Sequence, residues 1–419
     1  MPLKRVAALL ALAAGAGVAQ EPPNREALQY AIIVTRHGVR SPTWTLARLN
    51  QYSTEPWPDF GVPPGHLTPH GRKLMGILGA FYREYLSGRG LRGADDCAAP
   101  AAACFRADAD QRTRETACAL AETMRPGCKT EIQAAPEGSA DALFDPISGG
   151  AAKPDLALSR AAVLGRTGAK LDALIAAHRP ALDALHGILN GSGKAARSIF
   201  DERSGLAESA DGLAVTGPLR LASTFSENLQ LEYANGMEGR QLGWGRLNAA
   251  NLLEVLSLHT LYADLMRRTP QLARTRGSNL LAAIARSLEQ AVAGKPVRGA
   301  IGAPAGKVLV IAGHDTNLSN LSGLLGLSWV VPSHQPDDIP PGGALVFSLW
   351  RSRQDGLYAV RLQFVVQTLE QMRLAAPLTA ADPPAIADVF IPSCSSAAGG
   401  WPCEWSRFRR VVENALAPN

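Results

Sequence analysis

The sequence predicts an α/β fold, with a central sheet flanked by helices, together with an inserted, mostly α-helical domain. Two short apolar runs, at residues 31–34 and 308–312, indicate strands that are buried on both faces. Helical periodicity follows the first run, which gives the strand–helix alternation of α/β proteins. From residue 154 to residue 290, long Ala/Leu-rich segments replace this alternation, and their periodicity favours helices.

Local signals place the individual elements. A strand is expected at residues 30–35, and the helix after it begins with Thr68 as its cap and Pro69 in its first position. A short strand around residue 104 precedes a helix at residues 108–124. Further helices are expected at residues 171–186, 219–233 and 251–266, and further strands at residues 307–312, 344–350 and 357–366.

Residues 1–19 match a cleavable signal peptide. Lys4 and Arg5 precede an apolar run at residues 6–14, which is shorter than the ~20 residues of a membrane-spanning helix. Small residues follow up to Ala19, where we expect cleavage. The mature protein should therefore be periplasmic or secreted, with an α/β domain formed by residues 20–150 and 291–419 and a helical domain formed by residues 151–290.

Composition excludes several classes of protein. The chain has 419 residues with 42 Lys+Arg and 37 Asp+Glu, and 46% of its residues are hydrophobic. These values exclude a disordered chain, a collagen and a membrane bundle. The net charge of +5, which falls by two when Lys4 and Arg5 leave with the signal peptide, is too small to suggest a nucleic-acid partner. We expect no nucleic-acid and no membrane partner.

The six cysteines of an exported chain favour disulfide bonds over free thiols. Cys394 and Cys403 lie close together and far from the others, so their pairing is the simplest. Neither C-x-x-C nor H-E-x-x-H occurs, and we therefore expect no zinc site, no other metal and no cofactor. The spacing leaves open how the other four pair, which are Cys97, Cys104, Cys118 and Cys128.

The candidate chemistry lies at the ends of two apolar strands. Arg36, His37 and Arg40 follow the first strand, and His314 and Asp315 follow the strand at residues 307–312. Open α/β sheets bind ligands beyond the carboxyl ends of their strands, so these side chains converge if the two strands are neighbours. A third arginine, Arg112, follows the short strand around residue 104 and can join them. Clustered guanidinium groups match the oxygens of a phosphate group.

Charge then suggests a mechanism. Surrounding cations keep His37 neutral, and a neutral ring nitrogen can attack phosphorus. The arginines and His314 would stabilise the charge on the transferring phosphoryl group, and Asp315 would protonate the leaving alkoxide. Water would then hydrolyse the phosphohistidine. Each motif alone is weak evidence, because an Arg/His loop is often only solvated and Asp is a common helix cap. The conjunction of all three favours catalysis.

These residues resemble the histidine acid phosphatases, and among them the bacterial periplasmic phytases. The segment Arg36-His37-Gly38-Val39-Arg40-Ser41-Pro42-Thr43 is similar to the family's R-H-G-x-R-x-P signature, and His314-Asp315 is similar to its H-D signature. The resemblance implies a histidine-phosphatase-like α/β domain with a helical domain over the pocket. It also implies that His37 is the phosphorylated nucleophile, that Asp315 is the proton donor, and that the phosphate is held by Arg36, Arg40, Arg112 and His314.

The resemblance extends to the cysteines. Cys97 with Cys128, and Cys394 with Cys403, have the spacing of two family disulfides. Cys104 and Cys118 would then be either an extra pair or two buried free thiols.

Departures from the family affect the substrate. Enterobacterial phytases have a lysine immediately after the signature threonine, whereas this chain has Trp44, so one cationic contact to a highly phosphorylated substrate is missing. Arg240 could restore this charge, and Glu238 could do the opposite. The residues expected to contact substrate are Thr43, Trp44, Asp108 and Glu238.

We therefore expect a monomeric acid phosphomonoesterase that acts on a small-molecule phosphate ester, with phytate as the leading substrate. A broad-specificity acid phosphatase or a glucose-1-phosphatase is the alternative enzyme. A phosphate-ester binding protein without turnover is the alternative of a different class, although both a nucleophile and an acid are present.

Overall fold

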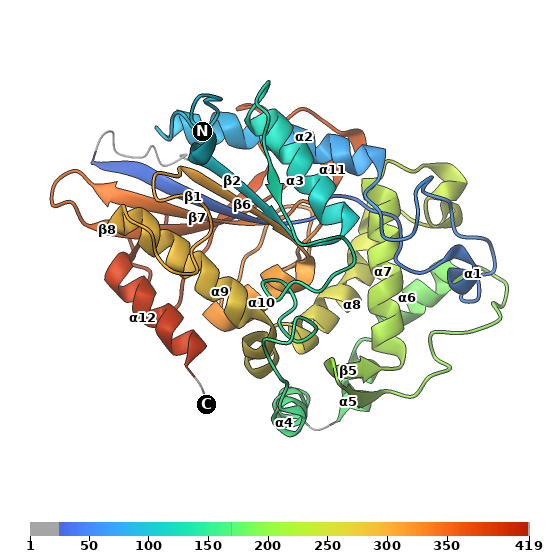
Figure 1. Cartoon of the computed structure of the whole chain (residues 1–419). Helices are drawn as coiled ribbons and strands as arrows, with labels where there is room; N and C mark the ends of the chain where they lie inside the picture. Colours follow the sequence, from blue (N-terminus) through green and yellow to red (C-terminus); the bar gives the residue numbers. More distant parts are fainter. Residues whose placement is uncertain (1–24, 169, 418–419) are drawn as a thin grey trace, which may run out of the picture.

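The computed structural model describes residues 25–168 and 170–417 (Figure 1). The predicted signal peptide therefore lies outside the described residues. Within these ranges, no helix is both long enough and apolar enough to cross a lipid bilayer.

One mixed sheet forms the centre of the molecule (Figure 1). Its strands run in the order β10-β8-β7-β1-β6-β2-β3, and β9 pairs with β8. The strands β1, β6, β2 and β3 are parallel, whereas β7 is antiparallel to β1 and to β8. The bounds are β1 (Glu26–Arg36), β2 (Ala103–Ala107), β3 (Ile132–Gln133), β6 (Val308–Gly313), β7 (Ala344–Ser352), β8 (Tyr358–Val366), β9 (Ala385–Asp388) and β10 (Cys403–Glu404).

Helices cover both faces of this sheet (Figure 1). On one face, α2 (Pro69–Gly88) and α3 (Gln111–Met124) pack against Ile33 of β1. On the other face, α9 (Pro270–Ala293), α10 (Asp315–Leu325) and α12 (Trp405–Leu416) pack in the same apolar cluster as Ile32 and Val34. Alternate residues of β1 thus belong to different cores, and a slip of one residue would exchange them. This burial on both faces fixes the register that positions the end of β1.

The segment between β3 and β6 is mostly helical, as predicted. Several of its helices share a separate apolar core that includes Phe225. A hairpin of β4 (Gly205–Ser209) and β5 (Gly212–Thr216) interrupts the helices and was not predicted. The helices are α4 (Leu156–Arg166), α5 (Leu171–Ala177), α6 (Arg179–Asn190), α7 (Pro218–Ala234) and α8 (Ala249–Met266), followed by α9. The short elements elsewhere are α1 (Leu46–Leu49), α11 (Leu369–Leu374) and the 3₁₀ turns η1 (Pro100–Ala102), η2 (Gly239–Gln241) and η3 (Gly243–Gly245).

Strands from before and after this helical segment join the same sheet, because β6 inserts between β1 and β2. Helix α9 falls within residues 151–290 for most of its length, yet it packs with the core of the sheet. The exact division into two domains stays a prediction.

Two helices differ from their predicted bounds. The helix expected at residues 171–186 is divided at His178, two residues before Pro180, whose nitrogen cannot donate a helical hydrogen bond. The helix expected at residues 108–124 begins only at Gln111, because Asp110 has an extended backbone and occupies the N-cap position. The predicted cap of α2 is confirmed, since the side chain of Thr68 accepts a hydrogen bond from the Gly71 nitrogen at 2.9 Å.

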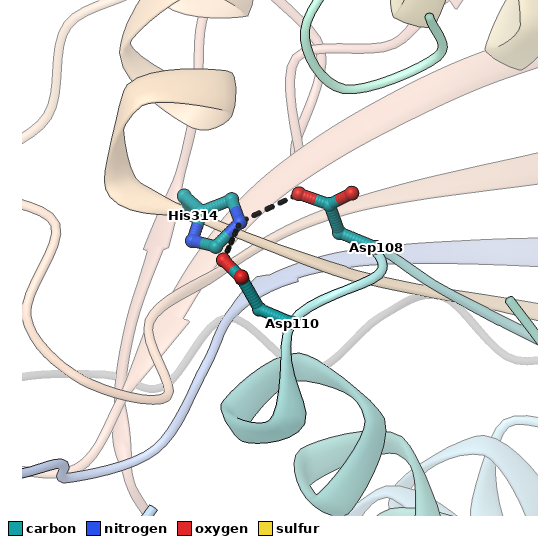
Figure 2. A group of neighbouring side chains, drawn as sticks. All are labelled: Asp108, Asp110 and His314. Carbon is teal, nitrogen blue, oxygen red and sulfur yellow. Dashed lines mark hydrogen bonds and ion pairs between the residues drawn. The ribbon is translucent and has the colours of Figure 1, made fainter. Parts of the chain in front are cut away.

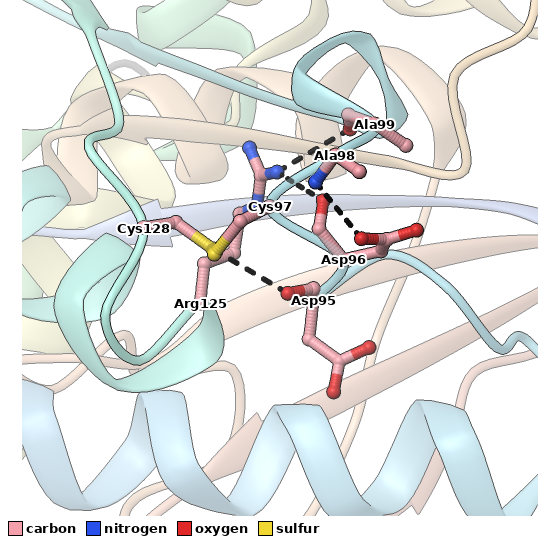
Figure 3. The surroundings of a disulfide bond; sticks show 7 residues. All are labelled: Asp95, Asp96, Cys97, Ala98, Ala99, Arg125 and Cys128. Atoms are coloured by element: carbon pink, nitrogen blue, oxygen red, sulfur yellow. Dashed lines mark hydrogen bonds between the residues drawn. A yellow bond between two sulfur atoms is a disulfide. The ribbon is translucent and has the colours of Figure 1, made fainter.

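Both disulfides implied by the family resemblance are present. Cys97 pairs with Cys128 (Figure 3), and Cys394 pairs with Cys403. The alternative of an extra bond between Cys104 and Cys118 is wrong, because both are free thiols.

Candidate active site

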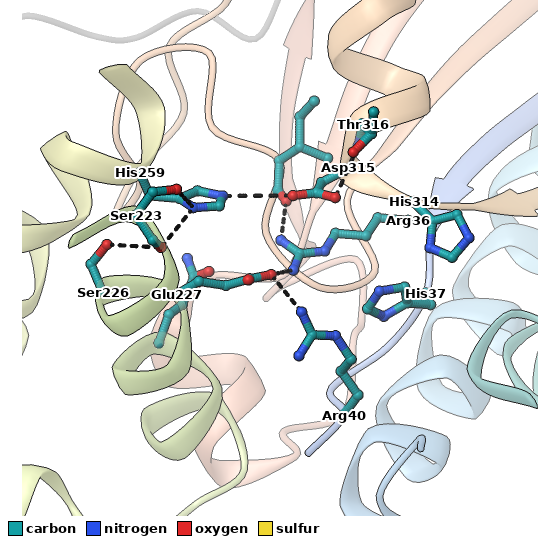
Figure 4. Close-up of polar contacts among 12 residues, drawn as sticks. Arg36, His37, Arg40, Ser223, Ser226, Glu227, His259, His314, Asp315 and Thr316 are labelled. Atoms are coloured by element: carbon teal, nitrogen blue, oxygen red, sulfur yellow. Dashed lines mark hydrogen bonds and ion pairs between the residues drawn. The ribbon is translucent and has the colours of Figure 1, made fainter. Parts of the chain in front are cut away.

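The predicted convergence of two strand ends is confirmed. β1 and β6 are parallel neighbours, with Arg36 opposite Gly313 at their carboxyl ends. His37 and His314, the residues that directly follow the two strands, therefore lie side by side (Figure 4). Their ring centroids are 5.5 Å apart in an edge-to-face arrangement. Arg112 joins them from the first turn of α3, which follows β2.

The backbone around His37 is held on both sides. The His37 nitrogen donates to the Gly313 oxygen at 2.9 Å, and the His37 oxygen accepts from the Gly342 nitrogen at 3.1 Å. Gly38 is required next to it, because an added Cβ would lie 2.8 Å from Met75 Cγ and 3.0 Å from the Gly71 oxygen. The nucleophile candidate therefore sits on a close-packed turn.

A hydrogen bond defines the tautomer of His37. Its Nδ1 lies 2.8 Å from the Gly38 carbonyl oxygen, which can only accept, so Nδ1 carries the proton and Nε2 has a free lone pair. Burial lowers the pKa of His37 well below its usual range, and the charges of Arg112, Arg36, Arg40 and His314 lower it further. The direction agrees with the sequence-based prediction, but burial is the largest cause. His37 therefore stays neutral at a lower pH than an ordinary histidine.

Arg36 and Arg40 share one carboxylate. Glu227 Oε1, on α7, accepts from Arg40 Nη2 at 3.0 Å and from Arg36 Nη2. Burial alone would raise the pKa of Glu227, but Arg40 and Arg36 outweigh it and lower the pKa to about 2. Arg36 is also anchored by the Ile339 oxygen at 2.6 Å. The shared carboxylate fixes both guanidinium groups while leaving a net positive charge between them.

Figure 2 shows a second set of partners, around His314. Its Nε2 lies 2.7 Å from Asp108 Oδ2 and 3.5 Å from Asp110 Oδ2. Arg112 Nη2 forms an ion pair with Asp110 at 2.5 Å and lies 3.5 Å from His314 Nδ1. Two carboxylates therefore orient His314 and Arg112 toward each other. Asp108 pairs with His314, and its expected contact with substrate stays a prediction.

Asp315 is surrounded by hydrogen-bond donors. Its Oδ2 pairs with Arg267 Nη1. The same oxygen lies 3.6 Å from His259 Nε2, and Oδ1 accepts from the Thr316 nitrogen at 2.9 Å (Figure 4). Burial would raise the pKa of Asp315, but Arg267, Arg36 and His259 together hold it well below its usual range. The free enzyme therefore carries an ionised Asp315.

The two candidate substrate contacts in the signature loop lie near the cations. Thr43 is exposed and flanks Gly65, where an added Cβ would lie 3.7 Å from Thr43 Cγ2 and 3.6 Å from Arg112 Nη1. Trp44 packs edge-to-face against Phe225, with 5.9 Å between ring centroids. The Arg48 guanidinium lies 3.5 Å from the centroid of Trp44 and so places a positive charge at this position.

Glu238 and Arg240 are less directly involved. The side chains of both are 80% exposed. Glu238 pairs with Arg373 at 3.5 Å, and Arg240 pairs with Glu55. Glu55 therefore opposes the positive charge that Arg240 could add.

Three polar residues of the site were missed in the sequence: Glu227, His259 and Arg267. They lie on α7 and at α8 and its C-terminal cap, within segments that read as apolar helices. The only signal was the position of Glu227 and His259 among residues at helical spacing that are otherwise buried, where an unpaired charge would be costly.

Two groups of side chains in the described parts of the chain place ligand atoms close enough to hold a metal ion. In both groups, guanidinium groups already pair with the carboxylates, and a divalent cation would have to displace them. We therefore assign both groups to one anion site. The first group consists of Asp108, Asp110 and His314, with Arg112 as the paired guanidinium. The second group consists of Glu227, His259 and Asp315, and its paired guanidinium groups are those of Arg36, Arg40 and Arg267.

Comparison with known proteins identifies this arrangement. The chain matches the histidine phosphatase superfamily (branch 2) over residues 27–172 and 180–365. It is 34% identical to phytase AppA of Escherichia coli K12 over 423 residues, which cover 98% of this chain and 96% of that protein. It is 25% identical to a glucose-1-phosphatase of Providencia rettgeri, over 93% of this chain and 92% of that protein.

Solved structures agree with these matches. The apo form of Hafnia alvei phytase superposes with a TM-score of 0.87 at 34% identity, over 95% of this chain and 99% of that chain. The complex of the same phytase with myo-inositol hexakis sulphate has a TM-score of 0.86 at 34% identity. Because the family match spans both halves of the sheet and the strand ends that carry His37 and His314, the chain belongs to the histidine phosphatase superfamily (branch 2) and is a phosphatase.

Proposed function

We propose that the protein hydrolyses phosphate monoesters through a phosphohistidine at His37, with Asp315 as proton donor and inositol hexakisphosphate (phytate) as preferred substrate. The hydrogen bond from His37 Nδ1 to the Gly38 oxygen, at 2.8 Å, is the observation that carries the mechanism. It leaves the lone pair of Nε2 for attack on phosphorus, and burial among cations keeps this nitrogen unprotonated.

The reaction then proceeds in two displacements. Asp315 takes up a proton from solvent once the phosphate ester is bound. His37 Nε2 then forms a bond to phosphorus as the bond to the leaving oxygen breaks, and Asp315 transfers its proton to that oxygen. Water next attacks the phosphohistidine, releases inorganic phosphate and returns a proton to Asp315. Guanidinium groups stabilise the charge on the equatorial oxygens in both steps, and they come from Arg36, Arg40 and Arg112.

Phytate is supported by the comparisons and by local charge. The phytases AppA and that of Hafnia alvei are 34% identical to this chain, whereas the glucose-1-phosphatase of Providencia rettgeri is 25% identical. Arg48, stacked on Trp44, adds a cation beside the signature loop. A substrate with several phosphate groups can engage such a cation while one phosphate occupies the catalytic cluster.

A simple monoester such as glucose 1-phosphate is the second candidate. Glu55 favours it, because this carboxylate pairs both with Arg240 and, at 2.8 Å, with Arg246. Glu55 cancels one of these two positive charges and thereby weakens their attraction for the additional phosphate groups of phytate.

A substrate panel decides between these candidates. Values of kcat/KM are measured for phytate, glucose 1-phosphate and p-nitrophenyl phosphate between about pH 4 and pH 7, the range over which carboxylates and histidine titrate. We expect the highest kcat/KM for phytate, by about tenfold or more, which corresponds to roughly 1.4 kcal/mol. A strong preference for either simple ester would exclude the phytase proposal. In Glu55→Gln, the freed arginines should lower KM for phytate and leave KM for p-nitrophenyl phosphate unchanged.

We also propose that the protein works outside the cytoplasm as a monomer. Two disulfides are typical of an oxidising compartment, and they support the proposed export. N-terminal sequencing of the exported protein, with Gln20 expected first, and its sedimentation behaviour test the two proposals.

A further inference from the structure

We propose that Arg267 is a positioning residue that holds Asp315 as a carboxylate directed toward α8 until a phosphate ester binds, and that it thereby sets the upper pH limit of catalysis. This inference rests on the proposed role of Asp315 as proton donor. It concerns a residue outside both signature motifs, on the helical segment that faces the ends of the strands.

The geometry around Asp315 suits a carboxylate rather than a carboxylic acid. Arg267 Nη1 donates to Oδ2, and the Thr316 nitrogen donates to Oδ1 at 2.9 Å. Both partners offer only donors, whereas a protonated carboxyl needs one acceptor for its own proton. A carboxyl group that is ready to donate its proton would need a hydrogen-bond acceptor beside it, and neither Arg267 nor the Thr316 nitrogen is one.

The position of Arg267 is well defined. It is the C-cap of α8, where its backbone nitrogen donates to the Ala263 oxygen at 2.9 Å. Its side chain is 17% exposed, and that of Asp315 is 12% exposed. An ion pair that is this shielded from water interacts strongly, and it links the helical segment to the first residue of α10.

The other charged groups that face Asp315 come from three elements. His259 on α8 places Nε2 3.6 Å from Oδ2, Arg36 extends from β1, and Glu227 on α7 carries the opposing negative charge. His259 Nδ1 faces the Ser223 oxygen at 3.2 Å and the Ser223 hydroxyl at 3.1 Å. Among the charges that lower the pKa of Asp315, that of Arg267 has the largest effect, and its removal should therefore raise this pKa most.

Substrate binding must reverse this state. A phosphate ester held by Arg36 and Arg40 brings negative charge close to Asp315, and a like charge favours the protonated carboxyl. Arg267 opposes that protonation. The donor is therefore available only on the acidic side of a limit that Arg267 lowers.

The test uses two small substrates that differ in their leaving groups. The leaving group of glycerol 2-phosphate is an alkoxide that needs the proton, whereas the p-nitrophenolate of p-nitrophenyl phosphate leaves without one. In Arg267→Gln, the alkaline limb of the kcat profile for glycerol 2-phosphate should move up by about one pH unit. At one pH unit above the midpoint of the wild-type alkaline limb, kcat of the variant for glycerol 2-phosphate should therefore be several-fold higher than that of the wild type. The change for p-nitrophenyl phosphate should be smaller, and Arg267→Lys should retain the wild-type limb.

Arg268→Gln is the matched control. Arg268 is the neighbour of Arg267 and pairs with Asp337 at 3.1 Å and with Asp264 at 3.6 Å, but not with Asp315. This variant also loses a partly buried ion pair, and its pH limb should stay where it is in the wild type. In an Asp315→Asn background, Arg267→Gln should no longer move the alkaline limb.

Two results would overturn the inference. A raised KM with an unmoved limb would mean that Arg267 binds substrate, and an equal loss on both substrates with a lower Tm would mean that it only supports the fold. Failure of the proposed role of Asp315 as proton donor can be told apart from these results, because it would be seen in a protein that retains Arg267. In that case, Asp315→Asn alone would slow the two substrates equally.

Discussion

His314 Nε2 donates a hydrogen bond to Asp108 Oδ2 over 2.7 Å. Burial would raise the pKa of Asp108, but its contact with His314 outweighs this and lowers the pKa, so the partner of the imidazole is an anion. The carboxylate therefore stabilises a proton on Nε2 and orients the ring beside His37.

Asp108→Asn should weaken phosphate binding. Without the carboxylate, His314 loses the group that accepts its Nε2 proton and orients its ring. Loss of one charge-assisted hydrogen bond, about 1.5 kcal/mol, corresponds to roughly tenfold weaker competitive inhibition by inorganic phosphate. The inhibition constant is measured with p-nitrophenyl phosphate as substrate. An unchanged constant would show that the contact between Asp108 and His314 does not support phosphate binding.

His37→Ala should abolish turnover and the covalent intermediate. Loss of a nucleophile reduces kcat by roughly 10³-fold or more. The intermediate is trapped by quenching in base and detected by mass spectrometry as a phosphorylated peptide that contains His37. Asp315→Asn is the control, since it should still form the phosphoenzyme from p-nitrophenyl phosphate. Substantial hydrolysis by His37→Ala would contradict the mechanism.

Glu227→Gln should make the stability of the protein less dependent on acid. The pKa of Glu227 is about 2 in the folded protein, below its ordinary value of 4.5. Its ionised form therefore stabilises the fold above about pH 4.5, and this contribution is lost as the pH falls toward 2. The difference in free energy of unfolding between wild type and variant should be on the order of 3 kcal/mol at pH 6 and should shrink below pH 4. Thermal unfolding at several pH values measures it, and a difference independent of pH would contradict the assignment.

The strand ends of the site could be predicted from sequence because their signals are local. Apolar runs that are buried on both faces mark β1 and β6, and polar residues follow each run directly. Parallel neighbours then bring His37 and His314 together without any knowledge of the loops.

The second half of the site depends on packing between distant segments. Glu227 meets Arg36 across 191 residues of chain, and Arg267 meets Asp315 across 48. The local sequence of α7 does not distinguish a solvated glutamate from one that bridges two arginines. The packing of the whole fold decides which face of α7 is turned toward the site. The hairpin β4–β5 was missed for a related reason, since five-residue strands carry little periodicity.

The thiol count should follow the disulfide pattern. Cys104 and Cys118 are free, whereas the other four cysteines form two bonds. A thiol reagent in denaturant should therefore modify only these two residues before reduction and all six cysteines after it. Peptide mapping identifies the modified residues. Protection of Cys104 and Cys118 in the unreduced sample would show a third bond.

Glu232→Gln should stabilise the protein at neutral pH but not at acidic pH. Glu232 is fully buried on α7, and its Oε2 accepts a hydrogen bond from the Gly243 nitrogen at 2.8 Å. Burial raises its pKa to about 8, although the bond from Gly243 opposes the shift.

This raised pKa gives the pH dependence its sign. Between about pH 4.5 and pH 8 the folded chain keeps a proton on Glu232 that the unfolded chain has lost, so stability falls as the pH rises. A glutamine has no such penalty and can still accept the bond from Gly243. The variant should gain up to about 3 kcal/mol at pH 7 and nothing at pH 4. Denaturant unfolding at the two pH values measures the gain. Equal gains at both would mean that Glu232 has the same pKa in the folded and the unfolded chain, whereas a gain confined to pH 7 would show that burial keeps its carboxyl protonated.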